Sequence, residues 1–246
     1  MKIIKLDAIN STNEYLKNYI QNNSIRNTHA VYTFNQTKGK GQRGKVWLSE
    51  PEKNLAFSFC FFPKSLKVNN QFNLNMTISL FLLNTLKSLK IPNLKIKWPN
   101  DILSGEKKIC GILNEIKVKG NIIDNIIMGF GINVNQENFE NLPNASSLKL
   151  IKNINYDLNG LVSLITQNLN RYNYLNPKSE SEIKSLSLNY NENLYGTNAF
   201  NDFSDLNNNS FKGKVISVDQ KGVIKVQKKD NSFHNFNFHE IQMIFN

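Results

Sequence analysis

The sequence is poor in the features that mark secreted or membrane proteins. Among its 246 residues there are only two cysteines, Cys60 and Cys110, each inside an apolar run. Two such thiols indicate small core residues in a reducing compartment, not a disulfide framework. No apolar run approaches the roughly 20 residues that a membrane helix needs, and the first residues lack the apolar core of a secretion signal. We therefore expect a cytoplasmic protein without membrane contact.

Metal ligands and catalytic nucleophiles are also scarce. The three histidines, His29, His234 and His239, show no zinc-ligand spacing with one another or with the cysteines. No serine or cysteine lies in a recognisable nucleophile motif, and the GxxxxGK(S/T) pattern of a Walker P-loop is absent. The sequence thus argues against a zinc enzyme, a hydrolase with a serine or cysteine nucleophile, and a P-loop ATPase.

Acidic residues are outnumbered by Lys and Arg, 19 to 30, which gives a formal net charge of +11. Clustered cations can neutralise nucleic-acid phosphates, but these lysines are scattered apart from one cluster between Lys38 and Lys53. The abundance of Lys, Asn and Ile is what an AT-rich coding bias would give. We therefore expect no nucleic-acid partner. A basic nucleic-acid-binding module is the alternative from another functional class, and it predicts salt-dependent binding without ATP consumption.

Residues 1–190 alternate strand-like and helix-like segments, which predicts an α+β domain. The Ser-x-x-Glu spacing of Ser11 and Glu14 is that of a capping box at a helix start. Residues 119–121 form a plausible hairpin turn. Strands joined by hairpins, with helices between them, favour a mixed, largely antiparallel sheet packed with helices. Strands are predicted at 31–34, 55–61, 94–98, 108–118 and 122–134, and helices at 72–89, 158–175 and 180–188.

From about residue 191 the sequence pattern changes to short predicted strands separated by Asn-, Asp- and Gly-rich turns. The candidates lie at 194–200, 211–218, 222–226, 233–238 and 241–245. Strands so closely spaced predict a small β-barrel. We therefore expect two closely joined domains, 1–190 and 191–246.

A glycine-rich basic loop is the first candidate for chemistry. Three glycines within residues 39–44 let the backbone curve so that several N–H groups can point at one anion. Basic side chains between them add positive charge, and Trp47 offers a flat apolar surface at the rim. Such a loop can close over a phosphate-bearing ligand. The alternative is an ordinary solvated loop.

Two further segments place polar residues at predicted strand ends. Pro99 should end a strand in a rigid turn that presents Asn100 and Asp101 to a ligand or a metal ion. In the alternative, these side chains only satisfy the backbone of the turn. Lys108 begins an apolar strand and can place its ammonium at the sheet edge, over a pocket. The alternative is a solvated lysine at the end of a hairpin. Gly111 inside this strand indicates a close approach to its backbone.

A pair of glycines, Gly129 and Gly131, lies in the predicted strand 122–134. Residues two apart share one face of a strand, so the missing side chains leave room for a flat group such as a purine. A β-bulge is the alternative.

In this order and spacing, the segments resemble the successive motifs of the biotin–protein ligase family. The resemblance spans residues 5–190, and the C-terminal barrel is similar to the small SH3-like domain of that family. It implies a biotin/lipoate ligase-like, class II synthetase-like fold, in the short form without an N-terminal winged-helix repressor domain. The matching segments are Ser11-Thr12-Asn13, residues 36–44 with Trp47, KWPND at 97–101, Lys108 with Gly111-Ile112-Leu113, and GFGIN at 129–133.

The resemblance implies a reaction in which the biotin carboxylate attacks the α-phosphorus of ATP, with Mg²⁺ as cofactor. A lysine of a biotin carboxyl carrier protein then attacks the resulting biotinyl-AMP. A lipoate or octanoate ligase of the same fold is the nearest alternative enzyme. The implied biotin contacts are Ser11, Thr12, Asn13, Gln36, Gly39, Lys40, Gly41, Gln42, Lys108 and Gly111. The implied nucleotide contacts are Lys40, Gln42, Arg43, Trp47, Asn100 and Asn133. The implied catalytic residues are Lys108, Asp101 and Arg43, with Asp101 also the magnesium candidate.

The loop departs from the family pattern, which often has Arg where Lys40, Gln42 and Lys45 stand. Gln42 carries no charge at a position that the family uses near the phosphate of the intermediate. We therefore predict that Gln42→Arg slows the release of biotinyl-AMP, because the guanidinium adds a charged donor beside the phosphate. Release rates measured after dilution would test this, and identical rates for the two proteins would contradict it.

Overall fold

The computed structural model describes residues 1–171 and 179–245, without the side chains of residues 43, 170 and 171. Its main sheet has seven strands in the order β1-β2-β5-β9-β8-β7-β6. β1 runs parallel to β2, and the other neighbours are antiparallel. The predicted α+β fold with a mixed, largely antiparallel sheet is therefore confirmed. The strands are β1 (Lys2–Lys5), β2 (His29–Thr33), β5 (Leu55–Phe61), β6 (Leu94–Lys97), β7 (Asp101–Ser104), β8 (Lys107–Lys119) and β9 (Ile122–Ile132).

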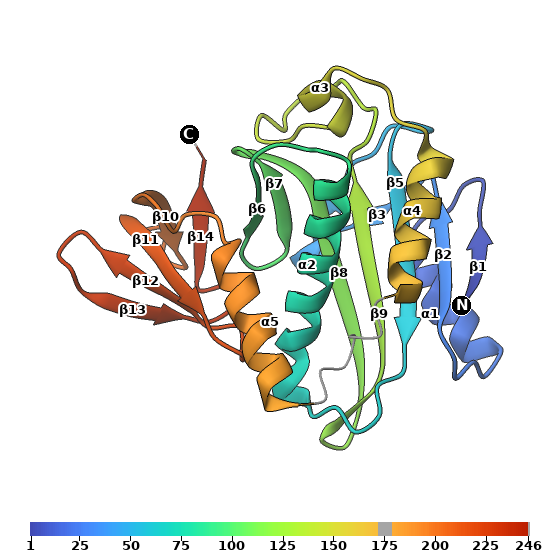
Figure 1. The fold of residues 1–246 in the computed structure, drawn as a ribbon, viewed down its shortest axis with the longest axis horizontal. Helices are drawn as coiled ribbons and strands as arrows, with labels where there is room; N and C mark the ends of the chain where they lie inside the picture. The colour runs from blue at the N-terminus through green and yellow to red at the C-terminus, as the bar shows by residue number, and fades with distance from the viewer. Residues whose placement is uncertain (172–178, 246) are drawn as a thin grey trace.

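The alternation of side chains along β5 gives each face of this sheet its own core. Phe57 and Phe59 belong to the large core that includes α2, whereas Cys60 packs with Val31 and Ile127 under α1. Because successive side chains of a strand point to opposite faces, α1 and α2 lie on opposite faces. Figure 1 shows α2, α4 and α5 in front of the sheet. The helices are α1 (Thr12–Asn22), α2 (Gln71–Ser88), α3 (Leu148–Lys152), α4 (Leu158–Arg171) and α5 (Glu180–Glu192).

The face of the sheet that carries α1 is hollow beyond the N-terminus of that helix. Ser58 is paired with Gly129 across β5 and β9, and Ala56 is paired with Gly131. Gly131 is in turn paired with Gly111 of β8. These positions share the face of α1 and carry small side chains or none. The register therefore leaves space above the centre of the sheet.

The C-terminal residues form a five-stranded antiparallel sheet in the order β13-β12-β11-β10-β14, which confirms the expected SH3-like barrel. Its core is continuous with the large core of the main sheet. At the junction, Trp98 stacks on Phe238 with ring centroids 5.5 Å apart, and its indole N–H donates to the carbonyl of Gly222 at 3.0 Å. The domain division at residue 190 stays a prediction. The strands are β10 (Asn201–Asp205), β11 (Ser210–Val218), β12 (Ile224–Lys228), β13 (Phe233–Phe236) and β14 (Ile241–Ile244).

The strand predicted at 194–200 is wrong, because the first strand of the C-terminal sheet is β10, at Asn201–Asp205. Leu194 instead forms a bridge with Ile96 at the free edge of β6, and Tyr195 donates its N–H to the carbonyl of Ile96 at 2.8 Å. Gly196 then turns the chain with φ +84°. The apolar residues here serve the edge of the main sheet, so β10 begins only after the turn.

Several short elements were not predicted. They are β1, β7, α3, and the hairpin of β3 (Gly39–Lys40) and β4 (Val46–Trp47) inside the basic loop. These segments have two to five residues, too few for a periodic pattern to emerge. The helix predicted at 158–175 is observed as α4, Leu158–Arg171, and the rest of that prediction lies outside the described residues.

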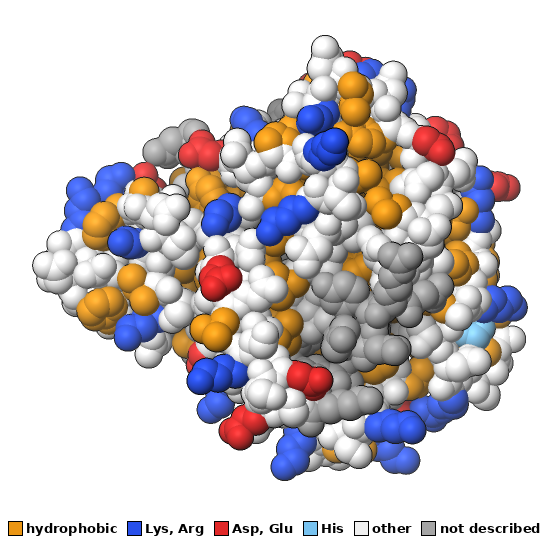
Figure 2. Space-filling model, in the orientation of Figure 1, with side chains coloured by type: hydrophobic (Ala, Val, Ile, Leu, Met, Phe, Trp, Pro, Cys, Tyr) orange, Lys and Arg blue, Asp and Glu red, His pale blue; other side chains and the backbone are white. Residues whose placement is uncertain are grey.

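The surface of the described protein fits the expectation of scattered charge. Figure 2 shows Lys and Arg side chains dispersed over the face of α2, α4 and α5, with Asp and Glu between them. No helix within residues 1–171 and 179–245 is long and apolar enough to cross a membrane.

Asn191 of α5 binds the C-terminal sheet through both groups of its side-chain amide. It donates to the carbonyl of Val218 at 3.0 Å and accepts the Val218 N–H at 2.7 Å. We predict that Asn191→Leu lowers the free energy of unfolding by about 1–3 kcal/mol, because it leaves buried backbone groups unpaired. Urea denaturation would measure this, with the exposed Lys184→Ala of the same helix as control. A variant as stable as the wild type would contradict the assigned contact.

Candidate functional site

A cavity of about 520 Å³ occupies the hollow on the α1 face of the main sheet and extends to the C-terminal sheet. Most of the site residues predicted from the sequence meet there, although they come from distant parts of the chain. The C-terminal sheet contributes residues between 203 and 208 and between 239 and 243. The predicted site residues that line the cavity are Ser11, Thr12, Asn13, Gln36, Lys40, Gly41, Gln42, Trp47, Asn100, Asp101, Lys108 and Gly111.

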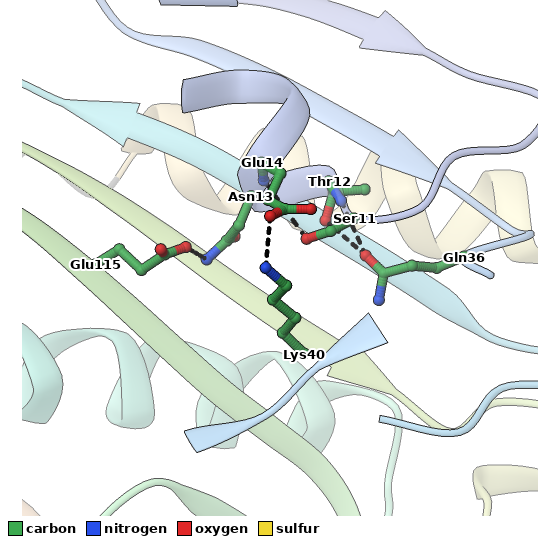
Figure 3. Close-up of polar contacts among 7 residues, drawn as sticks. All are labelled: Ser11, Thr12, Asn13, Glu14, Gln36, Lys40 and Glu115. Atoms are coloured by element: carbon green, nitrogen blue, oxygen red, sulfur yellow. Dashed lines mark hydrogen bonds and ion pairs between the residues drawn. The ribbon is translucent and has the colours of Figure 1, made fainter. Parts of the chain in front are cut away.

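One end of the cavity carries a network of hydrogen-bonding side chains at the N-terminus of α1, with the Lys40–Glu14 ion pair beside it (Figure 3). Ser11 caps the helix and accepts the N–H of Glu14 at 3.4 Å. Thr12 donates both its backbone N–H and its hydroxyl to Oε1 of Gln36, at 2.9 and 3.2 Å. Ser58 lies beneath and hydrogen bonds to Thr12 and Asn13 at 2.7 and 2.6 Å. The predicted helix start thus places buried polar groups around the cavity.

Asn13 is held over Gly129, where a side chain would leave no room for it. A Cβ at Gly129 would lie 2.0 Å from Oδ1 of Asn13. The amide of Asn13 donates to the carbonyl of Leu113 at 3.2 Å and to the carboxylate of Glu115 at 2.7 Å. Asn13 therefore connects α1 to β8, and glycine at 129 is required for this close approach.

Trp47 covers the centre of the sheet. A Cβ at Gly131 would lie 2.5 Å from its indole ring, and one at Gly111 would lie 2.8 Å from it. The expected close approach at Gly111 is therefore found. The flat group above Gly131 is the indole itself, where the sequence predicted room for a purine. No bulge interrupts the pairing of Gly129 and Gly131 with β5 and β8.

A β-bulge in β8 turns Lys108 towards the cavity. Ile102 pairs with Cys110 and Leu103 pairs with Lys108, so Ile109 is an extra residue. Without it, Lys108 would share the face of Cys110, which lies in the core under α2. The bulge instead places Lys108 on the face of Asp101, as bulges beside active sites commonly do.

The ammonium of Lys108 lies 2.7 Å from the carboxylate of Asp101, in a pair whose side chains are 35% and 16% exposed. It also lies 5.4 Å from the centre of the Trp47 ring. The Lys108 backbone is fixed on both sides, because its N–H donates to Asn144 at 2.7 Å and its carbonyl accepts from Ser146 at 3.0 Å. This second end of the cavity thus presents a rigidly mounted cation.

Lys97 adds a second cation beside this pair, and the sequence analysis did not assign it to the site. Burial lowers the pKa of its ammonium, the positive charges of Lys108 and Lys45 lower it further, and Asp101 raises it. Its Nζ lies 4.5 Å from the centre of the Phe245 ring. A half-buried group of cations around one carboxylate favours an anionic ligand.

Ser58 and Glu115 were also missed. Ser58 could have been found, because a serine between Phe57 and Phe59 must point to the face opposite the phenylalanines. Glu115 gives no such signal, since its contact with Asn13 joins residues about a hundred positions apart.

Three predicted site residues lie outside the described lining of the cavity. Arg43 lies in a 3-10 turn, Gln42–Gly44, and its side chain is outside the described structure. Gly39 lies in β3, paired with Trp47. Asn133 is buried and donates to the carbonyl of Ser146 at 3.0 Å, while its Oδ1 has no partner among the described residues.

Asn100 serves the backbone as well as the cavity. Its amide donates to the carbonyl of Ile112 at 2.7 Å, and its own carbonyl accepts the Ile112 N–H at 2.9 Å. The part of the chain that the structure describes contains no cluster of three His, Cys, Asp or Glu side chains that could hold a metal ion. Asp101 is thus an isolated carboxylate, and a metal ion here would need most of its ligands from a bound substrate.

The sequence and the structure were compared with known proteins. The bifunctional ligase/repressor BirA of Bacillus spizizenii is 27% identical over 93% of this chain and 70% of its own length. The biotin–[acetyl-CoA-carboxylase] ligase of Mycobacterium tuberculosis is 26% identical over 62% of this chain and 58% of its own length. The biotin protein ligase of Aquifex aeolicus, solved in complex with biotin and ATP, superimposes with a TM-score of 0.78 at 25% identity, covering 100% of this chain and 99% of that protein. Residues 6–133, more than half of the chain, match the biotin/lipoate A/B protein ligase family, and the chain therefore belongs to it.

Proposed function

We propose that this protein is a biotin–protein ligase, which converts biotin and ATP into biotinyl-AMP and pyrophosphate and then transfers biotin to a lysine of a carrier protein. The observation that carries the proposal is a single cavity with the hydrogen-bonding groups of Ser11, Thr12 and Gln36 at one end and the Lys108 ammonium beside Asp101 at the other. Biotin has a polar ring system and a carboxylate tail, so it matches both ends. The similarity to biotin protein ligases supports the same assignment.

The ring system of biotin fits the end formed by Ser11, Thr12 and Gln36. The cyclic urea of biotin carries two N–H donors and one carbonyl acceptor, and this end supplies hydroxyl, amide and backbone groups of both kinds. Ser11 already caps α1, so its hydroxyl can share only its remaining bonding capacity with a ligand. Thr12 and Gln36 are fixed by each other, which holds their groups in place before biotin binds.

The carboxylate of biotin and the α-phosphate of ATP fit the other end, at Lys108. Two anions must approach one another there, and a fixed cation reduces their repulsion. The carboxylate oxygen forms the bond to the α-phosphorus, and the bond to pyrophosphate breaks. Holding both reactants in attack geometry can contribute on the order of 7–11 kcal/mol to lowering the barrier.

Nucleotide contacts are proposed for Gln42, Arg43, Trp47 and Asn133. The unpaired Oδ1 of Asn133 is an acceptor that could take the amino group of an adenine, after a shift that brings it into contact with the cavity. Mg²⁺ would arrive with the phosphates of ATP and take at most Asp101 from the protein, where it would neutralise the phosphates.

In the second step, the amine of the acceptor lysine attacks the carbonyl carbon of the mixed anhydride and displaces AMP. Asp101 is positioned to accept a proton from that amine. A biotin carboxyl carrier protein is the proposed acceptor, which fits the acetyl-CoA-carboxylase ligase among the similar proteins. We place the reaction in the cytoplasm, because the buried thiols of Cys60 and Cys110 are unpaired.

The proposed function is tested by incubating the protein with biotin, labelled ATP and magnesium. We expect biotinyl-AMP bound to the protein and one pyrophosphate released for each adenylate formed. Lipoate and octanoate in place of biotin provide the specificity control. Adenylate formation with lipoate alone, or none with any of the three acids, would contradict the proposal.

Lys108→Ala should reduce the rate of adenylate formation by roughly 10²–10³, by analogy with the loss of one oxyanion-hole donor. It removes the cation at the carboxylate end and leaves Asp101 unpaired. Lys107→Ala is the matched control, because the Lys107 side chain is exposed and its ammonium donates to the carbonyl of Pro143, away from Asp101. Single-turnover measurement of adenylate formation gives both rates. A near-normal rate in Lys108→Ala would remove the role assigned to it.

A further inference from the structure

The basic hairpin Gly39–Trp47 is tied to the helix beside the cavity by one side-chain ion pair. Nζ of Lys40, at the end of β3, lies 2.5 Å from Oε1 of Glu14, in the first turn of α1 (Figure 3). Among residues whose side chains are described, this is the one ion pair between the hairpin and the rest of the protein. Its partner helix is the one that begins with the cavity residues Ser11, Thr12 and Asn13.

The Glu14 carboxylate pairs with Lys40 and does not complete the capping box of α1. In a complete capping box, the acidic residue three positions after the cap accepts the backbone N–H of the cap residue. Ser179 and Glu182 form such a box at the start of α5. In α1, Ser11 accepts the N–H of Glu14, but the Glu14 carboxylate bonds Lys40 instead. The same sequence pattern thus forms a complete capping box in α5. In α1 the serine still caps the helix, but the glutamate binds the hairpin.

The pair lies at the end of the cavity away from Lys108. Glu14 follows Asn13, whose amide donates to the Glu115 carboxylate at 2.7 Å. The contact with Glu14 raises the pKa of the Lys40 ammonium, and the charge of Glu115 acts in the same direction. Glu115 is seven residues along β8 from Lys108, and one of these steps is the bulge at Ile109, so the span corresponds to roughly 20 Å. Lys40 in this position therefore pairs with the Glu14 carboxylate at the end where Asn13 lies, and not with the anions that Lys108 serves.

We propose that Glu14 is a positioning residue that holds the hairpin over the occupied cavity through Lys40, and so sets how long the activated intermediate is retained. This rests on the proposed function, because it concerns the release of biotinyl-AMP. Lys40 acts here as the attachment point of the hairpin, in place of the phosphate contact that the family resemblance implies for it. Both side chains are about half exposed, 56% for Lys40 and 48% for Glu14, so the pair can open and close with the hairpin.

The strength of such a pair sets the size of the effect. Exposed ion pairs change equilibria only modestly, so Glu14→Gln should raise the release rate of biotinyl-AMP about two- to fivefold. The rate of adenylate formation should stay within about twofold, because Glu14 does not touch the reacting groups. Raising the salt concentration from about 0.05 M to about 0.5 M should bring the wild-type release rate towards that of the variant.

The experiment measures formation and release of biotinyl-AMP by the full-length protein in single turnovers. Glu137→Gln is the matched control, because Glu137 forms an equally short exposed pair with Lys149 and does not line the cavity. Reversal of the pair, Glu14→Lys with Lys40→Glu, separates attachment from a ligand contact. We expect Lys40→Glu alone to release the intermediate faster and the reversed pair to return release close to the wild-type rate.

Two results would overturn the proposal while leaving the proposed function intact. One is a release rate for Glu14→Gln equal to that of wild type and Glu137→Gln. The other is a reversed pair that releases as fast as Lys40→Glu alone, which would show that Lys40 itself contacts the intermediate. If the wild-type protein forms no biotinyl-AMP at all, the proposed function fails and this proposal fails with it.

Discussion

The bulge at Ile109 is the constraint on which the site depends. One extra residue in β8 transfers Lys108 from the core face of the sheet to the face of the cavity, where Asp101 receives its ammonium at 2.7 Å. Ile109 and Cys110 both stay buried in the core, so Lys108 changes face without exposing an apolar side chain. Removing either partner would leave a partly buried charge without compensation, so each side chain depends on the other.

The same face of the sheet also explains why the cavity has two unlike ends. Small residues at Ala56, Ser58, Gly129 and Gly131 clear the centre, and α1 brings uncharged polar groups to one end. The bulge brings the cation to the other end. We infer that the sheet register, α1 and the bulge together would orient a ligand with a polar ring and an anionic tail. The hairpin covers this face, with Trp47 over the centre of the sheet and Lys40 paired with Glu14 of α1.

Much of this could be predicted from the sequence, because the signals were local. The Ser-x-x-Glu spacing gave the start of α1, the turn at Gly120 gave the β8–β9 hairpin, and glycine inside β8 gave a close approach at Gly111. The resemblance of the ordered motifs to a known family predicted the site residues, and most of them line one cavity. What the sequence missed depended on contacts between distant residues. Neither the bulge nor the position of the Lys97 ammonium beside Asp101 and Lys108 can be predicted from a short window of sequence.

Other errors had the same physical origin. In the segment expected to form a strand at 194–200, Leu194 instead forms a bridge with Ile96 at the edge of β6. The space expected for a purine at Gly131 is occupied by Trp47. In both cases a contact with a distant part of the fold decided the outcome, and such a contact leaves no signal in the local sequence. The nucleotide contact expected of Asn133 stays a prediction, and its amide donates to the carbonyl of Ser146, in the segment that fixes the Lys108 backbone.

The most direct measurement is a crystal structure with a non-hydrolysable analogue of biotinyl-AMP. We predict that the ring system of the analogue lies against Thr12 and Gln36, and that its phosphate lies within hydrogen-bonding distance of the Lys108 ammonium, under a closed hairpin. An analogue bound away from Lys108, or a Lys108 side chain that faces solvent while the analogue is bound, would contradict the account.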